Sequence, residues 1–270
     1  MPRSIKPIKR KISYLLEDAL DSLLGRRDDL TPPKRKLFVG GYADFKGVGE
    51  EFLRYFVELG GLKPHERVLD VGCGIGRMAV PLTTYLDKNG SYEGFDIVAD
   101  GITWCRKKIT PKYPHFRFHL ADVFNEKYNP HGRYRASEYH FPYERESFDF
   151  VFLTSVFTHM LPHDVEHYLR ETAHVLKRGG RCLITFFLLT RESLELISAG
   201  KSTYDFTYEG GGFRTIDAAT PESGVAYDEE FIRGLYAESR LTIVEPIRFG
   251  SWCGRRDFLS YQDVIIAVKP

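Results

Sequence analysis

Three glycines at alternate positions follow a short apolar run that ends in an aspartate, in residues 68–79 (VLDVGCGIGRMA). Glycine lets the backbone turn sharply and approach a bound ligand closely. Glycine-rich turns between a strand and a helix hold several different nucleotides. The spacing of these glycines and the side chains around them must therefore indicate which ligand the turn accepts and what chemistry follows.

The glycine spacing disfavours two common nucleotide turns. A dinucleotide turn follows G-x-G-x-x-G, and its third glycine allows tight packing of the helix whose N-terminus faces the pyrophosphate. Here Arg77 stands where that third glycine belongs, after Gly72 and Gly74. A Walker phosphate loop is excluded because no Gly-Lys-Ser/Thr follows. Asp70, just before the glycines, could interact with an ammonium group, which points to a ligand with an amino acid portion.

The elements around this turn alternate between short β-rich runs and helical segments. The β-rich runs are residues 67–71, 92–96, 116–120, 148–153 and 182–189. This alternation predicts βαβ units with a parallel sheet and helices on both faces. Residues 241–247 and 263–268 are joined by a loop and not by a helix, so they should pair antiparallel. We predict an α/β fold whose sheet is seven-stranded and mostly parallel, with an antiparallel last strand and an N-terminal helical extension.

The chain is long enough for one sizeable core with an added subdomain. We expect residues 1–64 to form a helical extension or flap, and residues 65–270 to form the main domain with an insert at 190–240. An amphipathic helix is predicted over residues 12–24, between basic residues. Docking of this helix on the main domain is favoured over contact with a membrane surface. A later helix starting at Pro162 is expected to end at Gly179 and Gly180.

The stretch around the glycines resembles motif I of the class I S-adenosylmethionine-dependent methyltransferases. Asp96, at the end of the second β-rich run, matches the acidic residue that holds both ribose hydroxyls in this family. Asp122, after the third run, stands where the family places an acidic or polar side chain against the adenine amino group. The resemblance covers residues 65–188 closely and residues 241–270 by topology.

This resemblance implies methyl transfer with S-adenosylmethionine as the cofactor. By the same resemblance, the residues expected to bind the cofactor are Asp70, Gly72, Cys73, Gly74, Asp96, Ile97, Asp122, Val123, Ser155 and Val156.

A catalytic base is needed only if the acceptor must lose a proton, because methyl transfer otherwise depends on alignment and exclusion of water. His159 follows the fourth β-rich run, where many small-molecule members of the family carry a histidine near the methyl end of the cofactor. The near-neutral pKa of histidine suits deprotonation of a hydroxyl. An alternative stays open, in which His159 packs against the cofactor or caps the next helix.

The acceptor pocket is expected to come from segments outside the common sheet. Aromatic faces stack on rings and guanidinium groups bind carboxylate or phosphate, although either side chain can also serve loop packing. The candidates are Tyr42, His140, Phe213, Arg214 and Trp252. We expect a small-molecule acceptor methylated at an oxygen, such as a sugar, a glycan-linked compound or a phenol. The alternatives are N-methylation of a small amine, an NAD-dependent oxidoreductase and a non-catalytic membrane-surface adaptor.

Bulk properties limit the partners. The net charge of +1 gives no global attraction to nucleic acid, and no N/D-P-P-Y/F motif follows the fourth β-rich run, so no nucleic-acid partner is expected. The four cysteines form no C-x-x-C pair, and no apolar stretch approaches the roughly 18 residues of a membrane span, so we expect a cytoplasmic protein with reduced thiols. The sequence contains no set of His, Asp and Glu residues at the spacing of metal ligands, so no metal site is predicted. The oligomeric state is not indicated.

Overall fold

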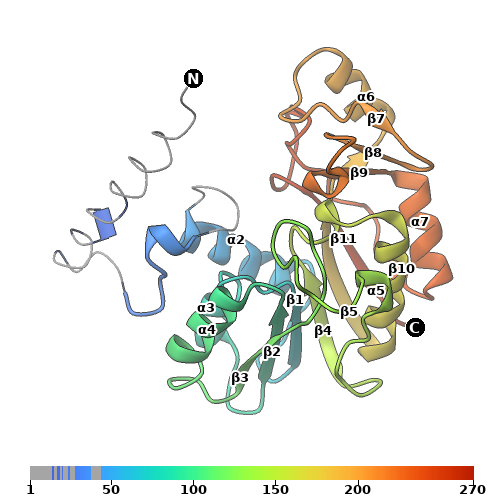
Figure 1. Cartoon of the computed structure of the whole chain (residues 1–270). Helices are drawn as coiled ribbons and strands as arrows, with labels where there is room; N and C mark the ends of the chain where they lie inside the picture. Colours follow the sequence, from blue (N-terminus) through green and yellow to red (C-terminus); the bar gives the residue numbers. More distant parts are fainter. Residues whose placement is uncertain (1–13, 15–16, 19, 21–23, 25–27, 38–43) are drawn as a thin grey trace.

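The computed structural model describes residues 14, 17–18, 20, 24, 28–37 and 44–270. Its main sheet has the strand order β10-β11-β5-β4-β1-β2-β3 (Figure 1). These strands are β1 (Arg67–Val71), β2 (Ser91–Asp96), β3 (Phe116–Leu120), β4 (Phe148–Leu153), β5 (Leu176–Phe186), β10 (Thr242–Ile243) and β11 (Asp263–Val268). The first five run parallel to one another, whereas β11 runs antiparallel to both β5 and β10. The predicted seven-stranded α/β sheet with its antiparallel last strand is confirmed.

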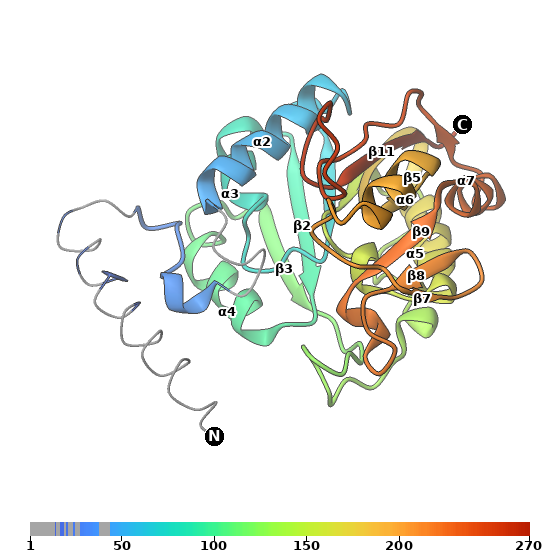
Figure 2. The ribbon, with the colours of Figure 1, turned by 90° about the horizontal axis from the view of Figure 1, so that it is seen from above.

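Helices cover both faces of this sheet (Figures 1 and 2). One face is covered by α2 (Phe45–Glu58), α3 (Ala79–Tyr85) and α4 (Ala99–Lys108), and the other by α5 (Pro162–Val175) and α7 (Glu229–Glu238). Side chains alternate between the two cores along each strand, as the period of two requires. In β4, Phe152 stacks on Phe56 of α2 with ring centroids 4.3 Å apart, whereas Val151 and Leu153 pack in the core under α5.

Helix α2 belongs to the cover of the sheet, although it lies in the predicted N-terminal extension. Asp44 caps its first turn by accepting a hydrogen bond from the backbone N–H of Lys46. Phe52 and Phe56 of α2 are buried against the sheet. Most of the helix predicted over residues 12–24 lies outside the described residues. None of the described helices is long and apolar enough to cross a membrane.

Most of the insert predicted at residues 190–240 folds, together with residues 188–189 just before it, into a second, smaller sheet with the strand order β6-β9-β8-β7. Its elements are β6 (Leu188–Leu189), α6 (Arg191–Ser198), β7 (Tyr208–Glu209), β8 (Phe213–Thr215), the short helix η4 (Pro221–Ser223) and β9 (Val225–Asp228). Helix η4 contacts η3 (Phe157–His159), which follows β4. The insert therefore reaches the end of the main sheet where the parallel strands finish (Figure 1).

The glycine pair after α5 does not end that helix as predicted. Helix α5 ends at Val175, and residues 176–180 already belong to β5, where the pairing with β4 shifts at a bulge. Gly179 has φ +74° and its N–H donates to the carbonyl oxygen of Lys269. A helix end and a β-bulge both call for a residue with positive φ, so the same glycine pair is typical of either.

Candidate functional site

The glycine turn after β1 lies against the ends of two neighbouring strands. Gly72 has φ +81°, and a Cβ atom at this position would lie 2.4 Å from Cγ2 of Val156, in the loop after β4. The N–H groups of Gly72 and Cys73 both donate to the carbonyl oxygen of Phe95 in β2. Only glycine permits this conformation together with this close approach.

The carboxylate of Asp96 holds the turn in place. Its Oδ2 accepts a hydrogen bond of 2.7 Å from the N–H of Gly74, and its Oδ1 accepts one of 2.8 Å from the N–H of Val98. Burial raises the pKa of Asp96 even though these backbone donors favour the ionised form. Each carboxylate oxygen keeps a second lone pair for a further donor.

Asp70 is buried beneath the turn with one oxygen unsatisfied. Its Oδ2 accepts a hydrogen bond of 2.6 Å from the hydroxyl of Tyr92, whereas Oδ1 has no hydrogen-bond partner among the described residues. Burial raises the pKa of Asp70 to about 8. A buried acceptor without a donor is costly, so this position favours a ligand that brings a donor or a positive charge.

These residues surround a cavity of about 240 Å³ at the carboxyl ends of the parallel strands, where open α/β sheets bind their ligands. The structure brings most of the predicted cofactor-binding residues together here. Those that line the cavity are Asp70, Gly72, Cys73, Gly74, Asp96, Ile97, Val123, Ser155 and Val156. The turn after β1 and the ends of β2 and β4 thus contribute to one site.

Asp122 departs from this arrangement, and its position does not support the predicted contact with the adenine amino group of the cofactor. Its carboxylate is half exposed, lies near Arg133 and accepts a hydrogen bond from the backbone N–H of that residue. The cavity is lined by the following residues Val123, Phe124 and Asn125, and Asp122 is not among the described lining residues. Asp122 instead closes the loop that returns at residues 133 and 134.

His159 lines the same cavity from the end of η3. Its Nδ1 lies 3.0 Å from the backbone carbonyl oxygen of Glu222 in η4. A carbonyl only accepts, so Nδ1 carries the proton and Nε2 has the free lone pair of the neutral ring. Burial lowers the pKa of His159 below the usual value of a histidine, which keeps the ring neutral near pH 7.

Several lining residues were not predicted from the sequence. Glu222 lines the cavity from the insert, and burial raises the pKa of its carboxyl group. Tyr128, Met160 and Tyr168 also line it. No local pattern marks Glu222, because the contact joins η3 and η4 across more than sixty residues of chain.

The structure brings none of the predicted acceptor residues that it describes to the lining of this cavity. Trp252 is fully buried and its Nε1 donates to Oδ2 of Asp263, so it serves packing. Phe213 packs against the main core from β8, and Arg214 forms an ion pair with Glu209 of β7. Tyr42 lies outside the described residues.

His140 also lies away from the cavity and forms part of a different cluster. Its Nδ1 lies 3.0 Å from Oε1 of Glu171, and His167 lies next to both. Linear spacing predicted no metal site, yet the fold brings two imidazoles and a carboxylate together here. The loop before β4 and helix α5 contribute these side chains, and their contact depends on the tertiary fold.

Comparisons with known proteins agree with this geometry. Residues 69–184 match the family model described as a methyltransferase domain. A curated relative, 27-O-demethylrifamycin SV methyltransferase from Amycolatopsis mediterranei, is 30% identical over 128 residues, which cover 47% of this chain and 41% of the relative. The chain therefore matches less than half the length of this relative.

Two solved structures share the fold. A methyltransferase from Methanosarcina mazei has a TM-score of 0.54 at 22% identity, covering 79% of this chain and 96% of the other. Magnesium protoporphyrin IX methyltransferase from Synechocystis, solved with bound S-adenosylhomocysteine, has a TM-score of 0.54 at 16% identity, covering 97% of this chain and all of the other. At such identities the similarity concerns the fold alone.

Proposed function

We propose that this chain, whose residues 69–184 match a family model of methyltransferase domains, transfers a methyl group from S-adenosylmethionine to an oxygen of a small-molecule acceptor. The observation that supports the choice of oxygen is His159, a half-buried neutral imidazole on the cavity wall. A hydroxyl acceptor must lose its proton, and an imidazole with a free nitrogen can take it. The similarity to an enzyme named for an O-demethylated rifamycin supports the same choice.

The cavity residues fit S-adenosylmethionine. The remaining lone pairs of Asp96 would accept hydrogen bonds from the ribose hydroxyls, since its carboxylate is already fixed by two backbone donors. The unsatisfied Oδ1 of Asp70 would accept from the ammonium group of the methionine portion. Gly72 leaves room for the ligand to approach the backbone between β1 and β4. The match to a methyltransferase family favours methyl transfer over the alternative of an NAD-dependent oxidoreductase.

The chain's own contribution to the reaction is alignment and proton removal. When bound, the cofactor supplies a methyl group activated on a sulfonium. The carbonyl oxygen of Glu222 accepts the Nδ1–H of His159 and so keeps Nε2 unprotonated. Nε2 takes the proton of the acceptor hydroxyl as its oxygen accepts the methyl group. The largely apolar walls, including Met160 and Val156, exclude water from this step.

The acceptor can be identified by incubating the protein with labelled S-adenosylmethionine and a metabolite extract. We expect a hydroxyl compound to gain one labelled methyl group. Label found only in amines would contradict the oxygen assignment. Binding of S-adenosylhomocysteine without any methylated product would contradict the proposal that this chain transfers a methyl group to a small molecule.

The base can be tested once an acceptor is known. His159→Gln should lower kcat by about 10²- to 10⁴-fold, the usual contribution of a general base. Affinity for S-adenosylhomocysteine should change little. His163→Gln is the matched control, because His163 is exposed at the start of α5 and is not among the described cavity residues. Equal rates for the two variants would rule out a proton-accepting role for His159.

We also propose that the protein works in the reducing environment of the cytoplasm. All four cysteines are free and buried, so none of them forms a disulfide. Burial raises the pKa of Cys73, Cys105 and Cys182 above the usual value of a thiol, which disfavours the reactive thiolate. These residues therefore act as small apolar side chains.

A further inference from the structure

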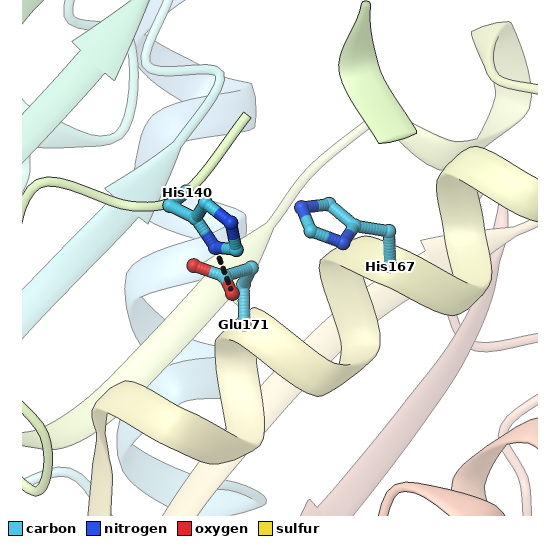
Figure 3. A group of neighbouring side chains, drawn as sticks. All are labelled: His140, His167 and Glu171. Carbon is cyan, nitrogen blue, oxygen red and sulfur yellow. Dashed lines mark hydrogen bonds and ion pairs between the residues drawn. The ribbon is translucent and has the colours of Figure 1, made fainter. Parts of the chain in front are cut away.

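Three metal-ligating side chains meet away from the cofactor cavity (Figure 3). His140 comes from the loop after the short helix η2 (Ala136–Glu138), and His167 and Glu171 come from α5. Each offers one ligand atom, and these atoms lie within 4.8 Å of one another. The described lining of the cavity includes none of the three.

The geometry is close to that of a bound metal ion. In a tetrahedral zinc site with bonds of about 2.0–2.1 Å, two ligand atoms lie roughly 3.3–3.5 Å apart. Nδ1 of His140 is already 3.0 Å from Oε1 of Glu171. Any wider pair in the cluster needs to close by at most about 1.5 Å to reach the tetrahedral spacing. The side chain of His140 is 81% exposed, so it can rotate to make this adjustment.

Two of the three side chains are already held by the backbone. Oε2 of Glu171 accepts a hydrogen bond of 2.7 Å from the N–H of Phe141, and the Glu171 side chain is only 12% exposed. Nε2 of His167, at the tip of the ring that faces His140 (Figure 3), lies 2.9 Å from the carbonyl oxygen of Tyr139 and carries the proton of this hydrogen bond, because a carbonyl only accepts. His167 and Glu171 are four residues apart on one helix and therefore share a face. The backbone bond to Oε2 of Glu171 orients this carboxylate and leaves Oε1 for an ion, as outer partners do in known metal sites.

We propose that His140, His167 and Glu171 bind one zinc-type divalent ion. The ion replaces the proton that His140 and Glu171 share in their hydrogen bond. His167 binds it through Nε2 after the proton of this nitrogen has moved to Nδ1 and the bond to Tyr139 has opened, and water completes the coordination. Two imidazoles and one carboxylate suit zinc and similar transition metals, whereas magnesium and calcium prefer oxygen ligands alone. The site joins the loop of residues 136–141 to α5.

This link bears on the neighbouring cavity. Ala136, in η2, and Tyr168, next to His167, both line the cavity. Binding of the ion therefore fixes two cavity walls relative to each other and stabilises the folded chain. The proposal does not depend on the acceptor or on methyl transfer, because the three ligands take no part in the reaction described above.

The test is calorimetric titration of the chelator-treated full chain with zinc chloride. We expect saturable binding of one ion per chain in the unmodified protein and in His174→Ala, a control that removes an exposed histidine from the same helix. His140→Ala and His167→Ala should each weaken binding at least tenfold. Cobalt should give the visible absorption of a tetrahedral site in the same proteins that bind zinc.

Two results would overturn the proposal: no saturable zinc binding by the unmodified chain, or unchanged affinity in His140→Ala, which would place the ion elsewhere. His140 is exposed, so its removal leaves the fold intact, and unchanged affinity for S-adenosylhomocysteine checks this. If His167→Ala does not fold, His140→Ala alone decides. A zinc-dependent rise in Tm, lost in His140→Ala, is the expected independent readout.

Discussion

Cofactor binding should weaken about tenfold when the pH falls from 7 to 6, because Asp70 must ionise to receive the ammonium group. Burial raises the pKa of this carboxyl to about 8, so below pH 8 its ionised form is the minority. Each further pH unit lowers that fraction about tenfold, which corresponds to about 1.4 kcal/mol of binding free energy. Binding should also release a proton.

The assay is calorimetric titration with S-adenosylhomocysteine at pH 6 and pH 7, in buffers that differ in their heat of ionisation. Asp70→Asn is the matched variant, because its amide oxygen can still accept the hydrogen bond from Tyr92. This variant should bind more weakly at pH 7 and lose the pH dependence. Comparison of this variant with the unmodified chain separates the contribution of Asp70 to the pH dependence from that of other titrating groups, such as Asp96 and His159.

The same pKa shift provides a control for folding. Because the folded-state pKa of Asp70 lies above its unfolded value of about 4, this group makes the free protein lose stability as the pH rises from 4 towards 8. Asp70→Asn removes this loss, so its Tm at pH 7 should be no lower than that of the unmodified chain. If the affinity for S-adenosylhomocysteine depends equally on pH in the two proteins, or does not depend on pH in the unmodified chain, Asp70 does not ionise to bind the ammonium group.

Other predictions concern the turn, the aromatic core and the loop after β3. Gly72→Ala should lower the free energy of unfolding by about 1–2 kcal/mol because of the positive φ alone, and the clash with Val156 should lower it further. In denaturant unfolding, the double variant Gly72→Ala/Val156→Ala should regain only the part of this free energy that is lost to the clash. Trp252→Phe should cost about 1–3 kcal/mol, because Asp263 loses a buried donor, and should leave KM for the acceptor unchanged; a raised KM would restore Trp252 as an acceptor contact. Asp122→Asn should change affinity for S-adenosylhomocysteine by less than about 0.5 kcal/mol in the same titration, since its side chain is half exposed beside Arg133; a large loss would place it at the adenine after all.

The sheet could be predicted because its signals are local. Each buried strand is a short apolar run, the glycine turn is a contiguous motif, and Asp96 directly ends the next such run. The start of α2 depends on its cap, Asp44, and the glycine pair at 179–180 fits a bulge as well as a helix end. Boundaries and bulges are therefore where the sequence is ambiguous.

The walls of the site were harder to predict, because tertiary contacts determine them. Aromatic and basic residues in loops can bind ligands or fill the core, and Trp252 fills the core. Glu222 meets His159, and His140 meets Glu171, only after distant segments have come together. The direction of the Asp122 side chain at the end of its strand is likewise set by the loop that it closes.

The most direct measurement is titration of the protein with S-adenosylhomocysteine and, separately, with NADH. We expect one S-adenosylhomocysteine bound per chain, much weaker binding by Asp96→Ala and by the nearly isosteric Asp96→Asn, and unchanged binding by Asp100→Ala, which removes an exposed acid nearby on α4. Tighter binding of NADH, or full affinity for S-adenosylhomocysteine in both Asp96 variants, would contradict this expectation.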